Sequence, residues 1–363
     1  MSAKPQIVQW LLDTRPLWPV TKKDKPKDET LYFGLRTRAD CSYAARALAL
    51  LSDEEQASVL KYYHVRDAKM SLGSYLLKHL VVAQYCNISW SQTRLSRTAK
   101  GKPCYIPSST EPNHVSIDFN VSHQAGIVSL IAAIGFDGKV DTGTDVVCIN
   151  ERGSRDKEQI DKSGFFEWVD IHAEVFAESE VSFMKLGPVS LEDLGIHGKT
   201  LGYGKDALSR CQCRVGKISL EVKGSDGSEN VVVDCNDVID AKLRRFYAMW
   251  CLREAYVKMT GEALLASWLK DLEILDMQAP SAKDNSLGED SLEPGSISTN
   301  FQISFFDNPV TDVKMELEAL GKGYMVGGAL RTKSAADREK MIIGKWKGLD
   351  LEKDVLFVAE RNP

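Results

Sequence analysis

The stretch WCLREAYVK, residues 250–258, carries the most specific pattern of the chain. At helical spacing Trp250, Glu254 and Lys258 fall at i, i+4 and i+8, so an aromatic ring, a carboxylate and an ammonium share one helix face. An ordinary amphipathic helix keeps its charged residues opposite its apolar stripe. Together with Asp145, this face is suited to hold a metal ion and phosphate.

The length and charge of the chain limit its fold and its partners. A chain of 363 residues, 43% of them hydrophobic, exceeds the size of most single hydrophobic cores, so we expect two domains or one fold that occurs twice. The net charge of −5 argues against a nucleic-acid partner, because binding to a phosphate backbone relies on surplus lysine and arginine. An anionic ligand must therefore be held by a local cluster of cations.

The cysteines and the N-terminal segment indicate the cellular compartment. The eight cysteines are scattered and show no zinc-binding spacing. The apolar stretch at 7–12 is short, contains Gln9 and ends before Asp13, which excludes a signal peptide or a membrane span. We expect a cytoplasmic protein with reduced thiols and no membrane partner.

Hydrophobic periodicity predicts alternating helices and strands. The region 48–86 has helical periodicity that is interrupted by the polar residues 64–69, so it predicts two helices, with Ser52 as an N-cap. Further predicted elements are strands at 127–134 and 141–149, a hairpin of 218–222 and 231–233, a helix at 241–259, and strands at 301–306, 313–320 and 324–330.

These elements suggest a division of the chain. We expect an N-terminal half at 1–140 and a C-terminal half at 141–335, followed by a tail at 336–363. The C-terminal half contains an insertion at about 187–240, where glycine and polar residues dominate, and a mobile polar loop at about 279–299.

A basic turn lies at 94–104, RLSRTAKGKPC. Arg94, Arg97, Lys100 and Lys102 supply four positive charges within nine positions, and Gly101 with Pro103 imposes a turn. Side-chain cations and backbone N–H groups could together hold an anion there. The alternative is a solvated basic loop without a ligand.

A second polar motif is FNVSH at 119–123. Adjacent residues of a strand point to opposite sides, so Ser122 and His123 are not expected to form a nucleophile with its base. Phosphate binding is the better functional interpretation. A structural role for both residues stays open as the alternative.

Asp145 lies in the apolar run 144–149. A buried carboxylate is costly unless it is paired or bound to a metal, so Asp145 either accepts backbone N–H groups or ligates a hard cation. Magnesium suits such a site, because it takes few carboxylates and completes its shell with water and substrate phosphate. Glu254 is the obvious second carboxylate.

One motif points elsewhere. LGEDSL at 287–292 is similar to the modification site of an acyl carrier protein, in which a serine receives phosphopantetheine. Carrier proteins place that serine at the start of a helix, whereas Pro294 and Gly295 follow Ser291 here within a polar tract. We therefore do not expect this chain to be a carrier.

The motifs combine into a family resemblance. FNVSH, residues 143–145 and residues 250–258, in this order, resemble the Sfp-type 4′-phosphopantetheinyl transferases, whose most specific signature is W-x-x-K-E-x-x-x-K. Residues 97–103, 61–72 and 259–269 add further matches, the last closest to fungal members that serve polyketide and nonribosomal peptide synthases. The resemblance covers about residues 5–330 and omits much of 187–240.

The resemblance implies a fold and a set of site residues. The fold would be α/β (α+β), a pseudo-dimer of two similar halves with coenzyme A between them. Asp145 and Glu254 would hold Mg²⁺, and these two residues with Lys258 would form the catalytic set. Arg97 would lie near the 3′-phosphate. The full set implied to bind coenzyme A is Lys61, Ser71, Arg97, Gly101, Lys102, Pro103, Ser122, His123, Arg253 and Lys258.

The resemblance also implies a reaction and partners. A carrier-protein serine would attack the coenzyme A pyrophosphate and release 3′,5′-ADP, with Glu254 as the base. The carrier domains would belong to polyketide synthases, nonribosomal peptide synthetases, fatty-acid synthase or the aminoadipate reductase of lysine biosynthesis. A chain that contains both halves would act as a monomer.

Several positions differ from the family pattern. The first lysine of the signature is Arg253 here, a planar fork in place of a compact ammonium. Val147 stands where many bacterial members carry a metal-binding Glu, and Thr144 where an aliphatic residue is usual. Ser58 replaces a basic residue of several relatives, for which Lys61 could compensate.

These differences keep a second hypothesis open, a non-catalytic homologue that binds coenzyme A or carrier proteins. A third possibility, an unrelated α/β protein in which each motif is a core feature, is disfavoured by the joint order of the motifs.

Overall fold

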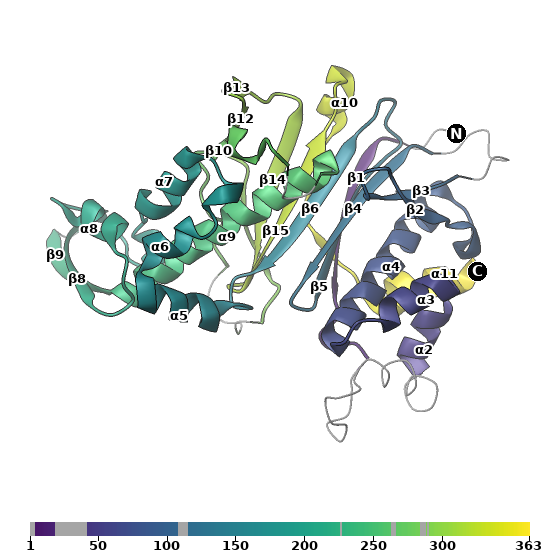
Figure 1. Ribbon diagram of the computed structural model, residues 1–363, viewed down its shortest axis with the longest axis horizontal. Helices are drawn as coiled ribbons and strands as arrows, with labels where there is room; N and C mark the ends of the chain where they lie inside the picture. Colours follow the sequence, from purple (N-terminus) through teal and green to yellow (C-terminus); the bar gives the residue numbers. More distant parts are fainter. Residues whose placement is uncertain are drawn as a thin grey trace.

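The computed structural model describes residues 4–18, 42–107, 115–225, 227–262, 266–283, 288 and 290–363. These residues form two four-stranded sheets with helices against them, so the predicted α/β class is confirmed (Figure 1). No helix within the described ranges combines the length and apolar composition needed to cross a membrane. A polar stretch at 21–30, rich in Lys and Asp, lies outside these ranges, as do Leu287 and Glu289 of the carrier-like motif.

The N-terminal half is built on a sheet of order β16-β1-β5-β4. Strands β1 (Gln6–Asp13) and β4 (Ile117–Gln124) both pair antiparallel with β5 (Ile127–Ile134), whose residues are all buried. The long helix α4 (Val65–Cys86) packs against β4 and β5, and the apolar stretch at 7–12 lies within β1. The predicted strand at 127–134 is therefore confirmed.

Two shorter helices precede α4. They are α2 (Ser42–Ala49) and α3 (Asp53–Leu60), and Ser52 caps α3 in a capping box with Glu55, as predicted. The break before α4 falls at 61–64, earlier than the polar residues suggested. Val65 and Ala68 are buried, so this part of the sequence is already a helix with one face in the core.

The C-terminal half is built on a sheet of order β11-β14-β15-β6. Strands β6 (Asp141–Cys148) and β14 (Val313–Leu320) pair antiparallel with β15 (Tyr324–Arg331), and β11 (Pro294–Ser298) adds to β14. Helix α9 (Cys235–Thr260) packs against β6 and β15 (Figure 1). It begins six residues before the predicted start, because Asp234 caps it by accepting the N–H of Asn236.

The two sheets meet along β4 and β6 through side chains. Asp118 and Asn120 of β4 accept the backbone N–H groups of Thr142 and Thr144, at 2.8 and 3.2 Å. Farther along, the Gln124 side chain accepts the N–H of Cys148 at 3.0 Å. The constant offset of 24 residues means that β4 and β6 run parallel. An apolar cluster behind this junction, which includes Ile131, Val146 and Val326, joins the halves.

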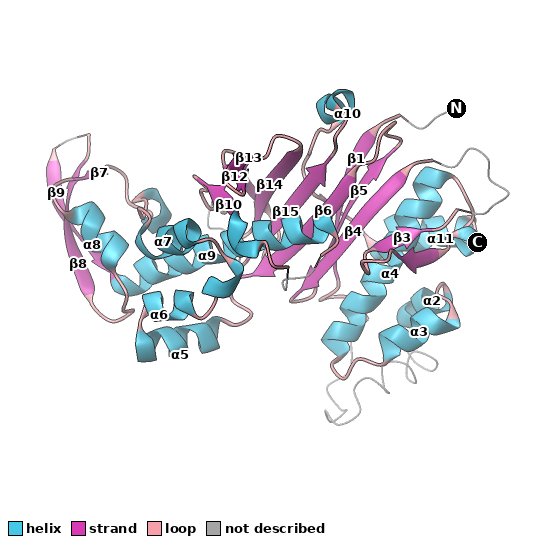
Figure 2. Ribbon diagram, turned by 45° about the horizontal axis from the view of Figure 1, so that its top comes forward, coloured by secondary structure: helices cyan, strands magenta, loops and turns pink. Residues whose placement is uncertain are grey.

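The insertion forms a small sheet beside three helices. Strands β7 (Lys199–Thr200), β8 (Lys217–Lys223) and β9 (Ser228–Asp234) pair antiparallel, as the predicted hairpin requires, and α8 (Gly204–Arg210) packs on them. This unit lies at the end of the molecule farthest from the N-terminal half (Figure 2). The helices that lead to it are α5 (Gly153–Ser163), α6 (Phe165–Asp170) and α7 (Glu178–Leu186).

Residues after α9 complete the C-terminal half and then leave it. A small sheet of β10 (Leu272–Leu275), β12 (Gln302–Phe305) and β13 (Asn308–Pro309) includes the predicted strand at 301–306. After α10 (Ala335–Lys340), β16 (Lys347–Gly348) pairs with β1 of the N-terminal half.

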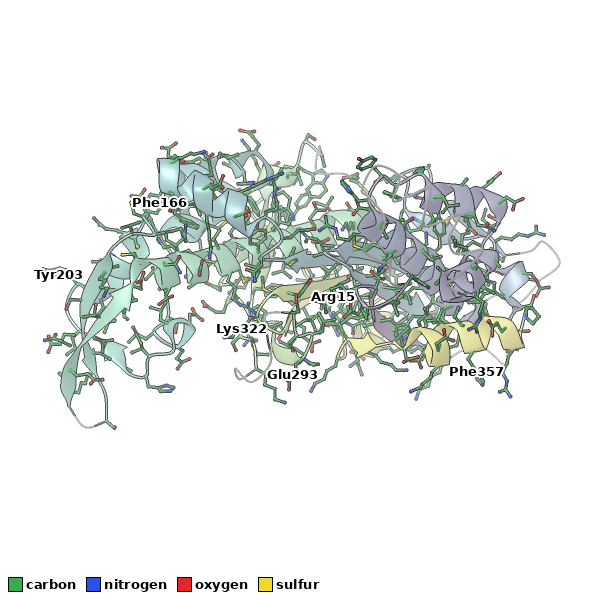
Figure 3. All side chains as sticks on the ribbon, turned by 90° about the horizontal axis from the view of Figure 1, so that it is seen from below. Arg15, Phe166, Tyr203, Glu293, Lys322 and Phe357 are labelled. Atoms are coloured by element: carbon green, nitrogen blue, oxygen red, sulfur yellow. The ribbon has the colours of Figure 1, made fainter. Side chains whose placement is uncertain are left out.

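The tail then fills the core of the N-terminal half. Leu351, Val355 and Leu356, in a π-helical turn (Leu351–Leu356), are buried there, and α11 (Phe357–Arg361) packs on α4. The tail and the insertion lie at opposite ends of the molecule, as Phe357 and Tyr203 mark in Figure 3.

Arg253 on α9 is a core residue, which corrects the prediction that it contacts coenzyme A. Its guanidinium donates to the carbonyls of Leu269 (2.6 Å) and Leu272 (2.7 Å) and to the carboxylate of Glu180. Both members of this ion pair have side chains that are 1% exposed. Position 253 is about 100° around the helix from Glu254, so its side chain points into the core.

Gly143 allows β6 and α9 to approach closely. A Cβ atom at this position would lie 2.1 Å from the carbonyl oxygen of Ala255 and 2.4 Å from the amide nitrogen of Met259. Both are backbone atoms, which cannot rotate away. We expect Gly143→Ala to lower the free energy of unfolding by about 3 kcal/mol or more, measured by urea denaturation. Gly153→Ala, with open space around the added methyl, is the control; equal stability of both variants would contradict the argument.

Removing Arg253 should destabilise the protein through its partner. In Arg253→Met the Glu180 carboxylate stays buried without its cation, which costs about 3–5 kcal/mol of unfolding free energy. The double variant with Glu180→Gln should recover part of this loss in the same measurement. If the single variant is as stable as the parent, the ion pair does not stabilise the C-terminal half.

Candidate active site

Three side chains from three elements meet at the junction of the two halves. The carboxylate oxygen Oδ1 of Asp145, on β6, accepts hydrogen bonds from Ser122 Oγ at 2.7 Å and from Lys258 Nζ at 2.6 Å. The Lys258 ammonium also donates to Ser122 Oγ at 2.8 Å. Strand β4 supplies Ser122 and helix α9 supplies Lys258, so the structure assembles these predicted residues into one polar triangle.

The strand and helix hold Asp145 in place. Asp145 is buried, 6% exposed, on the same face of β6 as Gly143, the face that contacts α9. The thiol of Cys251, two turns before Lys258, donates to the backbone carbonyl of Asp145 at 3.4 Å. The buried carboxylate is thus paired with a cation, as the cost of burying a charge requires.

Glu254 lies one turn before Lys258 on the same face of α9. Burial raises the pKa of its carboxyl, the nearby Asp145 charge raises it further, and Lys258 opposes both effects. Its carboxylate accepts no hydrogen bond from the residues the structure describes. A bound cation would stabilise the charged forms of both Asp145 and Glu254.

Lys258 keeps its charge at neutral pH. Burial alone lowers the pKa of its ammonium, but Asp145 and Glu254 outweigh this effect and raise the pKa above its ordinary value. The side chain is 30% exposed, so one side of the ammonium remains accessible. The triangle therefore combines negative charge with a cation that can reach a ligand.

His123 follows Ser122 on β4 and points to the other side, as predicted from strand geometry. Ser122 is buried and His123 is exposed. The surrounding protein partly desolvates the ring, which lowers the pKa of His123, and the Lys258 charge lowers it further. At neutral pH the imidazole is therefore largely neutral and can donate or accept a hydrogen bond.

The predicted basic turn joins β2 (Leu95–Arg97) to β3 (Pro103–Tyr105). Gly101 has φ +82° and donates to Thr98 O at 2.8 Å, and the Arg97 guanidinium donates to Gly101 O at 2.7 Å. Lys100 pairs with Glu262 at 2.8 Å, just beyond the end of α9. The turn thus reaches from the N-terminal half to the C-terminal end of the helix that carries Lys258.

Lys102 belongs to the junction between the halves. Its buried ammonium donates to the carboxylate of Asp118. The same carboxylate oxygen accepts the N–H and the hydroxyl of Thr142, each at 2.8 Å. Asp118 was absent from the predicted set, yet it ties Lys102 to β6 three residues before Asp145.

Lys61 and Ser71 are the remaining predicted residues. Lys61 is exposed at the end of α3, with its ammonium 5.9 Å from the centre of the Tyr62 ring. Ser71 is buried on α4. Neither forms a hydrogen bond with Asp145, Ser122 or Lys258. Both stay predictions as ligand-binding residues.

Two departures from the family pattern have local explanations. Val147 is 2% exposed and belongs to the core beneath α9. The Thr144 hydroxyl donates to Gly327 O at 2.9 Å and lies 3.2 Å from Ser129 Oγ, so this polar residue is satisfied between the sheets.

The structure reveals polar residues that sequence reasoning missed. Asp118, Asn120 and Gln124 lie on one face of β4, with Ser122 between the last two, and point at the N–H groups of β6. Together with Ser122 they recur at every second position, which was the available signal, because polar side chains on one face of an interior strand need partners.

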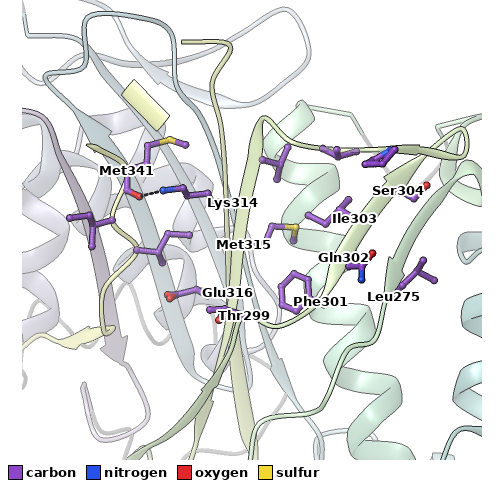
Figure 4. A pocket seen from close by; sticks show the side chains of 15 residues that line it. Leu275, Thr299, Phe301, Gln302, Ile303, Ser304, Lys314, Met315, Glu316 and Met341 are labelled. Atoms are coloured by element: carbon purple, nitrogen blue, oxygen red, sulfur yellow. Dashed lines mark hydrogen bonds between the residues drawn. The ribbon is translucent and has the colours of Figure 1, made fainter. Parts of the chain in front are cut away.

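A separate cavity of ≈ 640 Å³ lies beside β12 and β14 (Figure 4). Its walls include Phe301, Met315 and Ile342, and Lys314 Nζ donates to Met341 O at 2.9 Å at its edge. No predicted site residue lines it, so the chemistry is assigned to the triangle and not to this cavity.

Comparison with known proteins identifies the family. A family model described as "4'-phosphopantetheinyl transferase, N-terminal" matches residues 39–135. The chain is 36% identical over 358 residues to 4'-phosphopantetheinyl transferase 1 of Fusarium mangiferae, covering 98% of this chain and 96% of the relative. It is 36% identical over 362 residues to the 4'-phosphopantetheinyl transferase of Aureobasidium melanogenum, covering 96% of each.

A mouse relative, L-aminoadipate-semialdehyde dehydrogenase-phosphopantetheinyl transferase, is 35% identical over 113 residues, 31% of this chain and 34% of the relative. The two fungal matches extend over nearly the whole chain, and the predicted motifs meet in one cluster. The chain therefore belongs to the 4′-phosphopantetheinyl transferase family.

Proposed function

We propose that this protein transfers the 4′-phosphopantetheine group of coenzyme A to a serine of acyl and peptidyl carrier domains. The apo carrier becomes the holo carrier, and 3′,5′-ADP is released. The observation that carries this proposal is the meeting of Asp145, Ser122 and Lys258 at the junction, beside Glu254. The printed names of both fungal relatives support the same activity.

The residues of the triangle would act on the pyrophosphate. The serine oxygen of the carrier forms a bond to the phosphorus that bears pantetheine, and the bond from that phosphorus to the bridging oxygen breaks. The electron pair leaves with 3′,5′-ADP, and Glu254 takes the serine proton. Lys258, which keeps its ammonium, stabilises the charge that develops on the phosphate oxygens.

Magnesium fits the carboxylates that are present. Asp145 and Glu254 provide oxygen ligands on facing elements; burial raises the pKa of Glu254, and the Asp145 charge raises it further. No group of three or more His, Cys, Asp or Glu side chains suited to a metal occurs among the described residues, so water and pyrophosphate would complete the shell. When bound, Mg²⁺ neutralises pyrophosphate charge.

Coenzyme A would lie along the surface from the basic turn to α9. Arg97, Gly101, Lys102 and Pro103 would contact it at one end, with Arg97 at the 3′-phosphate. Lys61, Ser71, Ser122, His123 and Lys258 complete the proposed set. Arg253 is left out of the coenzyme A set, because its guanidinium donates hydrogen bonds to Glu180 and to two backbone carbonyls.

We also infer that the two halves are copies of one fold. Each contains a strand, a long helix and two further strands, β1-α4-β4-β5 and β6-α9-β14-β15. In each sheet the third strand lies between the first and the second, with antiparallel pairing. This common order supports a pseudo-dimer, with boundaries near 140 and 335 and with the insertion at about 187–240 added to the second copy.

The partners follow from the activity. Carrier domains of polyketide synthases, nonribosomal peptide synthetases and fatty-acid synthase would be substrates in the cytoplasm. The name of the mouse relative supports an aminoadipate reductase as another. A monomer suffices, because one chain supplies β4, β6 and α9. The alternative, a non-catalytic homologue that binds coenzyme A or carriers, retains the same site but predicts no turnover.

Carrier labelling tests the proposed activity. Purified protein with coenzyme A, Mg²⁺ and apo carrier should add the phosphopantetheine mass to the carrier serine. Asp145→Asn and Glu254→Gln should each reduce kcat/KM by about 10²-fold or more, because each removes a charge at the reacting phosphate. Glu229→Gln, an exposed carboxylate in the insertion, is the matched control. Absence of turnover by the parent protein would favour the non-catalytic alternative, and full activity of both site variants would refute the assigned roles.

The pKa of Glu254 predicts the pH dependence. A protonated Glu254 can neither accept the serine proton nor bind Mg²⁺, so activity should rise with pH through its pKa. Because that pKa lies above the ordinary value of 4.5, the acidic limb of kcat/KM should lie above 4.5 as well. Mg²⁺ competes with the proton, so a higher Mg²⁺ concentration should move the limb to lower pH. A limb that does not respond to Mg²⁺ would argue against metal binding at Glu254.

A further inference from the structure

Lys78 on α4 is a buried cation that has no anionic partner among the described residues. The residue is 8% exposed, and its ammonium lies 3.8 Å from the centre of the Tyr75 ring. It forms neither a hydrogen bond nor a salt bridge with any residue that the structure describes. Burial of an uncompensated charge destabilises a folded protein, so an anionic ligand that paired with the Lys78 ammonium would stabilise it.

The neighbours of Lys78 do not neutralise it. Burial lowers the pKa of its ammonium to about 8, the Arg97 charge adds to this effect, and Glu55 opposes it. The Glu55 carboxylate already accepts the N–H of Ser52 at 3.0 Å and lies 3.1 Å from His79 Nε2. The local field around Lys78 and Arg97 is therefore positive and suited to an anion.

The position of Lys78 connects it to the proposed coenzyme A surface. Lys78 follows Ser71 by seven residues, so both lie on one face of α4, with Ser74 between them. Its charge acts on His123 of β4 as well as on Arg97 of β2. Helix α4 packs against β4, the strand that carries Ser122 and His123, so Lys78 lies on an element next to residues that are proposed to contact the ligand.

We propose that Lys78 is a further binding residue for coenzyme A and that its ammonium pairs with the 3′-phosphate. This proposal rests on the proposed function. The pyrophosphate is assigned to Lys258 and the two carboxylates, whereas Arg97, whose charge acts on Lys78, is proposed to lie at the 3′-phosphate. A phosphate dianion between Lys78 and Arg97 would offset the repulsion of the two cations. Lys78 is already desolvated in the free protein, which strengthens such a pair.

The competing explanation is structural. If the cation–π contact with Tyr75 alone accounts for Lys78, removal of the ammonium should lower the stability of the free protein and leave ligand preference unchanged. If Lys78 is paired only when a phosphate is bound, removal of the buried charge should leave the free protein as stable as the parent or more stable.

The test compares two ligands that differ only in the 3′-phosphate. Calorimetric titrations with coenzyme A and with 3′-dephospho-coenzyme A give a ratio of dissociation constants for each variant. We expect Lys78→Met to reduce the preference for coenzyme A about tenfold, since a hydrogen bond between charged groups is lost, and to leave 3′-dephospho-coenzyme A affinity within about twofold. Lys78→Arg should restore part of the preference, and Lys217→Met, an exposed lysine of the insertion, is the control.

The outcomes separate the two proposals. An unchanged ratio in Lys78→Met, or equal losses for both ligands, would overturn the role of Lys78 while carrier labelling by the parent protein still supports the proposed function. Parent protein that binds neither ligand and labels no carrier would overturn both. Thermal unfolding of the free variants checks the structural explanation, which requires a lower midpoint for Lys78→Met.

Discussion

The parallel alignment of β4 with β6 is the constraint on which the site depends. Polar side chains of β4 accept the N–H groups of β6 at one constant offset, so the junction has a single register. A shift of one residue would turn every side chain of the strand to the other face. Ser122 would then leave Asp145, and the apolar cluster between the sheets would lose its fit. The contacts that join the halves therefore also assemble the chemistry.

Two faces of helix α9 lie in different environments. One face presents Glu254 and Lys258 to β6, whereas Arg253 belongs to a face buried against α7 and β10. This division explains why a lysine-to-arginine difference within the signature need not weaken the site. Three donors of the guanidinium fork are matched by two carbonyls and a carboxylate, a geometry that a single ammonium would satisfy less well.

The sequence predicted those parts of the fold that local periodicity determines. Strands β5, β6, β14 and β15 and most of α9 have patterns that depend on one buried face, and the site residues Asp145 and Lys258 could be placed on β6 and α9. Contacts between distant segments carry no such pattern. Arg253 was misplaced because its partner Glu180 lies 73 residues away, and Asp118 was missed because its donors come from the turn between β2 and β3 and from β6.

The tail affects the order in which the two halves can fold during synthesis. Leu351, Val355, Leu356 and Ala359 occupy the core of the half that is synthesised first. That half contains its sheet and α4 early, yet its apolar surface stays incomplete until residues 351–359 have left the ribosome. The second half needs no such late segment for the core beneath α9. During synthesis, therefore, the C-terminal half can finish folding first. The N-terminal half completes its core only when residues 351–359 pack into it.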